Sequence, residues 1–325
     1  MFSYRSILKQ AWFIAWKNKH LWFFGLFASL AVAGGSMEYQ FMTQSTSQGL
    51  INGSYGILNK LLALSDLFQQ IGLGLVTLFH QDFFTILNTI TITLLTLTII
   101  CLFIWLAISS QAALVDSIKK LMSPKKKADS LSIRSGLTAG SQHFWSVLGL
   151  NIFIKVLIGF AFFIVSLPLL FLALSDQPSF IIAYTILFVI FVPIAVSLSL
   201  IIKYAISCRV LENKSVVASL TYAWHLFKKN WLISLEVALL LFIVSFLASA
   251  LLLIIIGVFF FPLLWFSLAF SLGGMTVIII LLALILAALF GSLFTTFQVS
   301  AWTDLYLQLK ANKGKAKLER VFQKK

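Results

Sequence analysis

Two ionisable residues, Lys155 and Glu236, stand within long apolar runs of the sequence. An ionisable side chain inside a membrane span is a candidate functional group, because hydrocarbon strongly disfavours charge. Lys155 follows Trp145 by ten residues, which is about 15 Å along a helix and near the middle of a bilayer. Its long stem favours snorkelling toward the start of the helix, or a hydrogen bond between helices. A contact with a substrate or a lipid phosphate is the alternative, so Lys155 is a candidate binding residue.

Glu236 is the second candidate binding residue. It follows Trp231 by five residues, which places it at a shallower depth in its apolar run. We expect a structural pair with Lys155 or Lys203 across neighbouring helices, because a lone charge in this environment is costly.

Hydroxyl side chains gather in the run NTITITLLTLT, residues 88–98. At helical spacing Thr89, Thr93 and Thr96 share one face. They could line a polar pathway. Threonine that bonds back to the carbonyls of its own helix is the commoner arrangement.

The sequence shows no catalytic constellation, and no Gly-rich phosphate loop, HExxH or GxSxG motif. The four histidines are scattered, at His20, His80, His143 and His225. No metal site and no cofactor are therefore expected. The protein is predicted not to be an enzyme, with a membrane-embedded enzyme kept as an alternative.

The composition then defines the class of protein. The chain has 325 residues, of which 60% are hydrophobic and 10% charged, whereas a soluble domain carries about 25% charged residues. Lipid as the surrounding solvent allows apolar side chains to face outward. The net charge of +14 could indicate nucleic acid in a soluble protein, but the positions of these charges indicate a membrane surface, and no nucleic acid partner is expected.

The apolar runs predict an all-α integral membrane protein, since a bilayer core needs about 20 apolar residues as helix. Residues 1–310 form one membrane domain, and residues 311–325 form a basic tail. Six transmembrane helices are expected, at about 21–36, 83–110, 146–173, 180–206, 232–258 and 275–302.

Lysine and arginine concentrate in four segments, at 1–20, 111–145, 203–231 and after 302, while only Lys60 falls in an outer loop. The positive-inside rule then places both termini in the cytosol. A cleaved signal peptide ending near residue 33 is the rival interpretation of the first span. The outer loop, 37–82, is expected to rest on the outer membrane surface, with docking of a partner as the alternative. Cys101 and Cys208 are not expected to form a disulfide.

An internal repeat is indicated by two similar phrases, AWFIAWKN at residues 11–18 and AWHLFKKN at 223–230. A more divergent counterpart, LTAGSQHFW, occupies residues 137–145. We therefore expect three pseudo-repeats, each an amphipathic surface helix followed by a two-span hairpin, at about 5–110, 130–208 and 215–305. Chance similarity among Trp-rich interfacial segments is the alternative.

The surface helices have apolar residues at helical spacing, with Trp and Lys beside them. Such helices lie in the headgroup layer, with Trp rings at the interface and Lys toward anionic phosphates. The expected partners are thus the phospholipid bilayer and anionic headgroups at the cytosolic face. The predicted membrane-interface anchors are Trp12, Trp16, Trp22, Trp145, Trp224 and Trp231.

The phrases LKQAWFIAWKNKHLWFFGLF and SLTYAWHLFKKNW resemble those of uncharacterised bacterial six-span membrane proteins, which are similar to the membrane domain of glycerophosphoryl diester phosphodiesterase. In that family the phosphodiesterase activity belongs to a separate barrel domain with His and acidic metal-binding residues. This chain ends in a basic tail without such a domain, so the resemblance implies the membrane domain without that activity.

Together these features predict a non-enzymatic multi-pass protein of the bacterial cytoplasmic (inner) membrane. Its expected role is lipid-related, or the organisation of the membrane or envelope. A small transporter or permease is the alternative, with a polar path near Lys155 and the Thr-rich second span. The inferred repeats, Pro168 and Pro193 favour that alternative.

Overall fold

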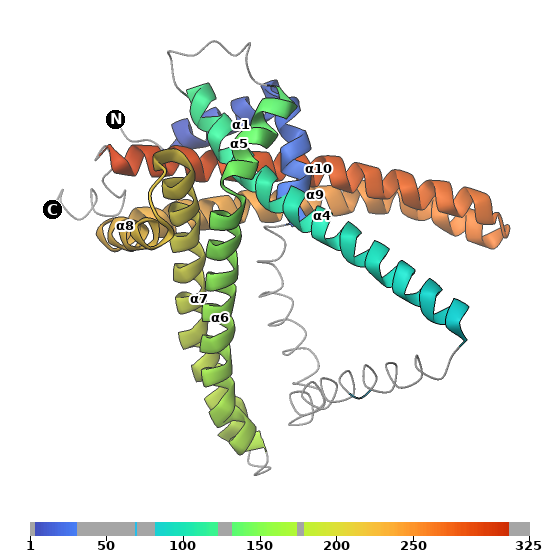
Figure 1. Ribbon diagram of the computed structural model, residues 1–325, viewed down its shortest axis with the longest axis horizontal. Coiled ribbons are helices and arrows are strands. Elements are labelled where there is room, and N and C mark those ends of the chain that lie inside the picture. The colour runs from blue at the N-terminus through green and yellow to red at the C-terminus, as the bar shows by residue number, and fades with distance from the viewer. Residues whose placement is uncertain (1–3, 31–68, 70–81, 123–131, 174–178, 312–325) are drawn as a thin grey trace. The chain divides into compact units, whose positions relative to one another are not determined.

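The computed structural model describes residues 4–30, 69, 82–122, 132–173 and 179–311, which are helical apart from caps and short turns (Figure 1). Most of the outer loop 37–82, most of the tail 311–325 and residues 31–36 of the first predicted span lie outside the described residues. The helices are α1 (Tyr4–Lys17), α4 (Phe83–Met122), α5 (Ile133–Gln142), α6 (Phe144–Ala173), α7 (Ser179–Glu212), α8 (Val216–Lys229), α9 (Trp231–Ala269) and α10 (Gly273–Lys310). A shorter apolar helix spans His20–Leu30.

Five helical segments are long and apolar enough to cross a membrane. They are Phe83–Met122, Phe144–Ala161, Val189–Glu212, Trp231–Ala269 and Gly273–Lys310. Each overlaps one of the spans predicted from the sequence, so the all-α class is confirmed for the described residues, and the five segments fit a multi-pass membrane protein. For the first predicted span, the structure describes the His20–Leu30 helix.

The long helices are each exposed along one part and packed along the other. All the buried residues of α4 lie between Ala107 and Ile118, and those of α10, except Ile279, lie between Ser292 and Leu309. The remaining parts expose large apolar side chains almost continuously. Such a surface suits lipid rather than water, and the packed parts must be held by neighbouring helices.

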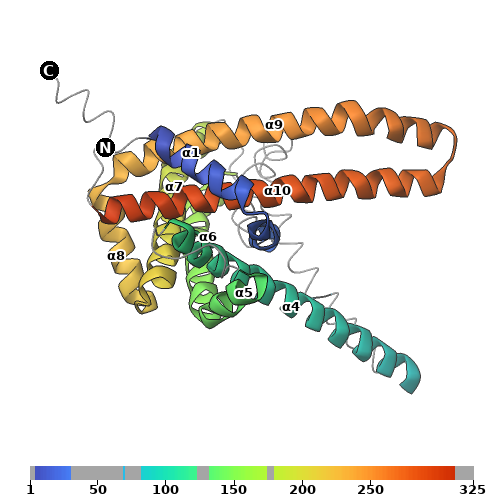
Figure 2. The same cartoon turned by 90° about the horizontal axis from the view of Figure 1, so that it is seen from above.

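The chain divides into two compact units, the first made of residues 1–31, 106–151 and 200–325 and the second of 32–105 and 152–199. In the first unit α9 and α10 form an antiparallel hairpin (Figure 2). The Ser267 and Thr276 hydroxyls are 2.6 Å apart near its tip, and Gln298 donates to Ser245 at 2.9 Å further along. The two helices therefore keep one register over most of their length.

Helix α1 packs along α10 in the same unit (Figure 2). Its buried face consists of Ile7, Ala11, Ile14 and Ala15. The two alanines have zero exposure, and their small side chains let the helix backbones approach closely.

The His20–Leu30 helix is bonded to α10 through its backbone. The Ser292 hydroxyl donates to the Trp22 carbonyl, and the Thr296 hydroxyl donates to the Leu21 carbonyl at 3.3 Å. Gly25 makes this approach possible, since a Cβ there would lie 2.3 Å from the Ser292 carbonyl oxygen.

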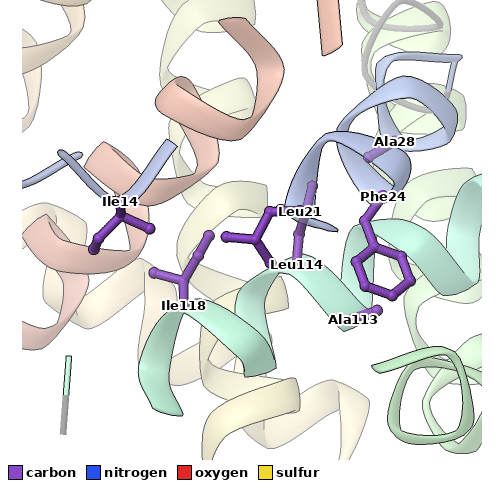
Figure 3. Close-up of a cluster of buried hydrophobic side chains, with 7 residues drawn as sticks. All are labelled: Ile14, Leu21, Phe24, Ala28, Ala113, Leu114 and Ile118. Carbon is purple, nitrogen blue, oxygen red and sulfur yellow. The ribbon is translucent and has the colours of Figure 1, made fainter. Parts of the chain in front are cut away.

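The hydrophobic cluster of Figure 3 joins α1, the His20–Leu30 helix and the packed part of α4. Phe24 and Leu21 fill the space between these helices, and Leu114 and Ile118 come from α4. The cluster thus joins two neighbouring helices at the start of the chain to a helix about 90 residues later, which helps to hold this unit together.

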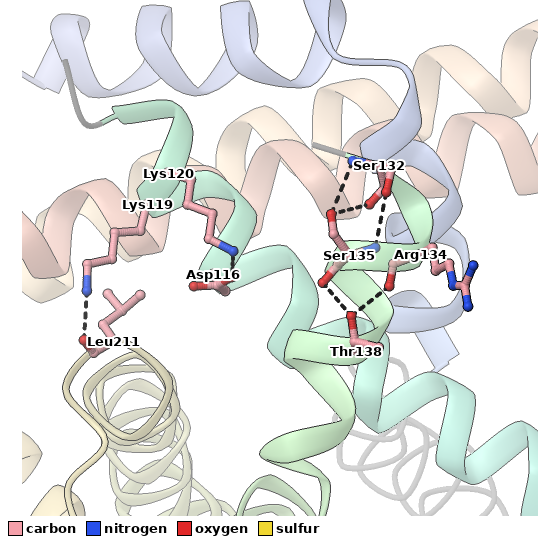
Figure 4. A network of polar contacts seen from close by, with 8 residues as sticks. All are labelled: Asp116, Lys119, Lys120, Ser132, Arg134, Ser135, Thr138 and Leu211. Carbon is pink, nitrogen blue, oxygen red and sulfur yellow. Dashed lines mark hydrogen bonds and ion pairs between the residues drawn. The ribbon is translucent and has the colours of Figure 1, made fainter. Parts of the chain in front are cut away.

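Helix α5 begins with a capping box, in which Ser132 and Ser135 each accept a hydrogen bond from the other's backbone N–H (Figure 4). This satisfies two amides at the start of the helix. Gly140 near its end approaches α4 so closely that a Cβ would lie 2.1 Å from the Ser109 carbonyl oxygen.

The repeated phrase adopts the same local structure in α1 and α8. Both helices have 14 residues and end at a lysine. The asparagine that follows donates its side-chain amide to the carbonyl four residues earlier, at 3.0 Å for Asn18 and 3.1 Å for Asn230. Ala11 and Ala223, which begin the two phrases, are both fully buried. The two phrases therefore form the same kind of helix end.

In the second unit, the Thr hydroxyls on the exposed part of α4 are satisfied by their own helix. Thr89, Thr93 and Thr96 each donate to the carbonyl four residues earlier at 2.8 Å. This is the commoner of the two arrangements considered for these residues.

Candidate functional site

The two candidate binding residues lie in different surroundings. Lys155 is exposed on α6, in the second unit. Glu236 is half-buried on α9 in the first unit, and it accepts a hydrogen bond from the Tyr4 hydroxyl of α1. This bond ties α1 to the start of the α9–α10 hairpin. The expected pairing of Glu236 with Lys155 or Lys203 stays a prediction.

Five of the six tryptophans expected at the membrane interface are about half exposed or more, and Trp22 is half-buried. Exposure is 49% for Trp12 and 53% for Trp224, the equivalent positions of the two phrases, and 79% for Trp145. Trp12 stacks on Trp16 with ring centroids 5.7 Å apart, and Trp16 meets Trp22 edge-on at 6.2 Å. An exposed, stacked tryptophan group of this kind suits a membrane interface.

The strongest polar cluster lies where α7 and α10 end, around the half-buried Glu212. One carboxylate oxygen of Glu212 accepts from the Tyr306 hydroxyl and from Lys310 at 2.8 Å. The other is 2.9 Å from the ammonium group of Lys214 in the α7–α8 linker. One carboxylate thereby joins the linker to the end of α10.

Two further cations bind backbone carbonyls, one at the end of α7 and one in the α7–α8 linker. Lys119 of α4 donates to the Leu211 carbonyl at 2.7 Å (Figure 4), and Arg209 donates to the Lys214 carbonyl. The last carbonyls of a helix have no partner within the helix and carry a partial negative charge. Lys119 therefore binds a carbonyl that has no partner within α7, and Arg209 holds the linker that follows the helix.

His143, in the turn between α5 and α6, extends this cluster toward α4. Burial lowers the pKa of the imidazole, the nearby Arg209 charge lowers it further, and Asp116 acts in the opposite direction. Asp116 itself pairs with Lys120 at 2.5 Å (Figure 4). Burial and the Arg209 charge thus both favour the neutral imidazole.

We call this cluster the basic junction. It brings together the ends of α4, α7 and α10, the α5–α6 turn and the α7–α8 linker. Within it, the hydrogen bond that Lys214 donates to Glu212 raises the pKa of Lys214. The ammonium nitrogen of Lys214 also lies 4.1 Å from the centre of the Tyr222 ring. The members are Asp116, Lys119, Lys120, His143, Arg209, Glu212, Lys214, Tyr306 and Lys310.

Glu212 lies just after the predicted span 180–206, so the expectation that ionisable residues inside spans are functional did not include it. The sequence does contain one indication of its role, because Glu212 is the sole acidic residue of the basic segment 203–231. Tyr4 gave no comparable signal, since nothing in its neighbourhood indicates a carboxylate partner more than 200 residues away.

The basic junction offers cationic donors and a neutral imidazole, a set suited to binding an anion. Within the described residues, no group of three His, Cys, Asp or Glu is placed to hold a metal ion. No protein-family model, curated protein or solved structure matches this sequence. The function therefore has to be argued from the geometry itself.

Proposed function

We propose that this chain is a non-enzymatic, multi-pass protein of the bacterial cytoplasmic membrane that handles lipids or organises the membrane around it. The observation that carries the proposal is the combination of continuous exposed apolar helix surface with a cation-rich cluster at the helix ends. Resemblance to the membrane domain of glycerophosphoryl diester phosphodiesterase belongs to the same proposal, without the phosphodiesterase activity.

The length of α9 supports a spanning hairpin. Most of its large apolar residues from Phe242 to Leu268 are exposed, and this stretch is about 39 Å long at 1.5 Å per residue. The hydrocarbon core of a bilayer is about 30 Å thick, so the stretch is long enough to cross it. The part of α9 before Phe242, where Ile233, Val237 and Leu241 are buried, then lies at the basic side of the bilayer.

The proposed topology has six spans with both termini in the cytosol. The His20–Leu30 helix begins the first span, and the five long helical segments supply the others. The ends of α4, α7 and α10 carry the cations of the basic junction, which the positive-inside rule assigns to the cytosolic side.

The three-repeat organisation is retained as part of the proposal, with one change for α1. Helix α1 packs along α10. If the α9–α10 hairpin spans the bilayer, α1 therefore runs beside the hairpin and does not lie flat in the headgroup layer. Trp12 lies 6.0 Å from Phe297, which places the tryptophan group beside the part of α10 where burial begins.

A small transporter or permease is the competing function. It would use a polar path near Lys155 and the Thr-rich second span. The exposed position of Lys155 is compatible with it, but the threonine hydroxyls are already bonded within α4. Lipid handling therefore has the better support from the described residues.

Lipid binding is tested by purifying the full chain gently and identifying the phospholipids that it retains by native mass spectrometry. We expect anionic phospholipids to be enriched over zwitterionic ones relative to the source membrane, because the basic junction favours anions. A delipidated protein that rebinds both classes equally would contradict the proposed function.

A further inference from the structure

The basic junction contains more cations than its acids can neutralise. Its two carboxylates are already engaged, Asp116 by Lys120 and Glu212 by Lys214 and Lys310. Lys119 and Arg209 then remain, and neither has a carboxylate partner among the described residues. The junction thus carries excess positive charge on the side formed by α4 and α7.

The backbone compensates only part of this excess. Lys119 and Arg209 each donate to a carbonyl at the end of α7 or just after it. A helix C-terminus carries the equivalent of about half a negative charge, whereas these two side chains carry two full positive charges. A half-buried cation without an opposite charge is unfavourable, and an anion bound beside it would relieve that penalty.

Unused polar groups lie at the same place. The Nε of Arg209 and the Nδ1 of His143 are enclosed, and neither has a hydrogen-bond partner within the described part of the chain. Buried polar nitrogens are almost always partnered in folded proteins. The charge of Arg209 also acts on His143, which places the two unpartnered nitrogens in one neighbourhood.

We infer that the Arg209 side of the basic junction binds the phosphate of an anionic phospholipid headgroup, with Lys119 and His143 as the neighbouring donors. This inference rests on the proposed function. We assign this phosphate to a lipid because the basic junction contains the basic ends of spanning helices. These ends lie at the level of the headgroups when the apolar part of α9 crosses the bilayer. Arginine suits a phosphate through its paired N–H groups.

The test compares Arg209→Gln with Arg134→Gln in the full chain. Arg134 is exposed on α5, and its guanidinium points away from Asp116 and Lys119 (Figure 4), so it controls for the loss of one charge. Native mass spectrometry would measure the binding of phosphatidylglycerol and phosphatidylcholine, which share the phosphodiester but differ in net charge.

We expect Arg209→Gln to weaken phosphatidylglycerol binding about fivefold, and Arg134→Gln to leave it nearly unchanged. Arg209→Lys should lose less than Arg209→Gln, because it keeps the charge although it lacks the paired N–H groups. If Arg209→Gln does not fold, His143→Gln provides the contrast, with a smaller loss in the same direction.

Three outcomes separate the alternatives. Equal losses in Arg209→Gln and Arg134→Gln would overturn the assigned site while leaving lipid preference intact. No preference for phosphatidylglycerol in the unmodified protein would instead overturn the proposed function. Displacement of phosphatidylglycerol by inorganic phosphate would contradict the assignment of the site to a lipid headgroup and would indicate a site for a small anion.

Discussion

Gly25→Ala should destabilise the protein by about 2–3 kcal/mol. The new methyl group would lie 2.3 Å from the Ser292 carbonyl oxygen and 2.4 Å from the Thr296 hydroxyl. The first of these atoms belongs to the backbone and cannot rotate away, so the His20–Leu30 helix must move off α10. Thermal unfolding of the purified protein in detergent would measure the loss.

The matched control is Gly149→Ala on α6, where an added Cβ meets nothing within 4 Å. Alanine is favoured over glycine in a helix interior by about 1 kcal/mol, so this variant should be unchanged or slightly more stable. Equal stability of the two variants would contradict the close packing of the His20–Leu30 helix on α10.

Glu212→Gln should also be strongly destabilising, by about 2–3 kcal/mol. The carboxylate accepts hydrogen bonds from Tyr306 and Lys310 and pairs with Lys214. An amide keeps the shape but loses the charge, and it presents two donors where the site supplies donors already. Unfolding measured in the same detergent would report the change.

Asp116→Asn is the control for Glu212→Gln, because it removes the same kind of charge from a single pair. Asp116 and Lys120 are one helical turn apart and partly exposed, and pairs of this kind contribute about 0.2–0.5 kcal/mol. If the two substitutions had equal effects, Glu212 would not be the residue that joins the linker to α10.

The sequence allowed the class of fold to be predicted because the signals for membrane helices are local. Long apolar runs mark the spans, as the overlap of the run 232–258 with α9 shows. The phrase shared by residues 11–18 and 223–230 also corresponds to the same helix end, since Asn18 and Asn230 bond in the same way. Such features need only neighbouring residues.

Features that depend on distant partners could not be predicted in this way. A glycine in an apolar run, such as Gly25 or Gly140, does not indicate which backbone it will approach. The packed second halves of α4 and α10 carry a larger share of polar residues than the exposed halves, among them Asp116 and Asp304, but this composition does not indicate which helix packs on them. Such features depend on contacts between helices that are distant in the sequence, and these contacts leave no local sequence pattern.

The binding residues show the same limit. Lys155 and Glu236 were predicted as binding residues because they interrupt apolar runs, whereas Arg209 was only one cation of the basic segment 203–231 and no prediction named Glu212. Their significance depends on the ends of three helices meeting at one place. A search for a solitary acid in a cationic segment would have found Glu212.

The central claim is that the α9–α10 hairpin crosses the bilayer with the basic helix ends on the cytosolic side. It is tested most directly by labelling Ser271→Cys, in the hairpin turn, and Lys228→Cys, at the end of α8, with Cys101 and Cys208 replaced. A membrane-impermeant maleimide on intact cells should label Ser271→Cys, and should label Lys228→Cys only after the membrane is permeabilised. Labelling of both positions from the same side would show that the hairpin does not span the membrane and would contradict the account.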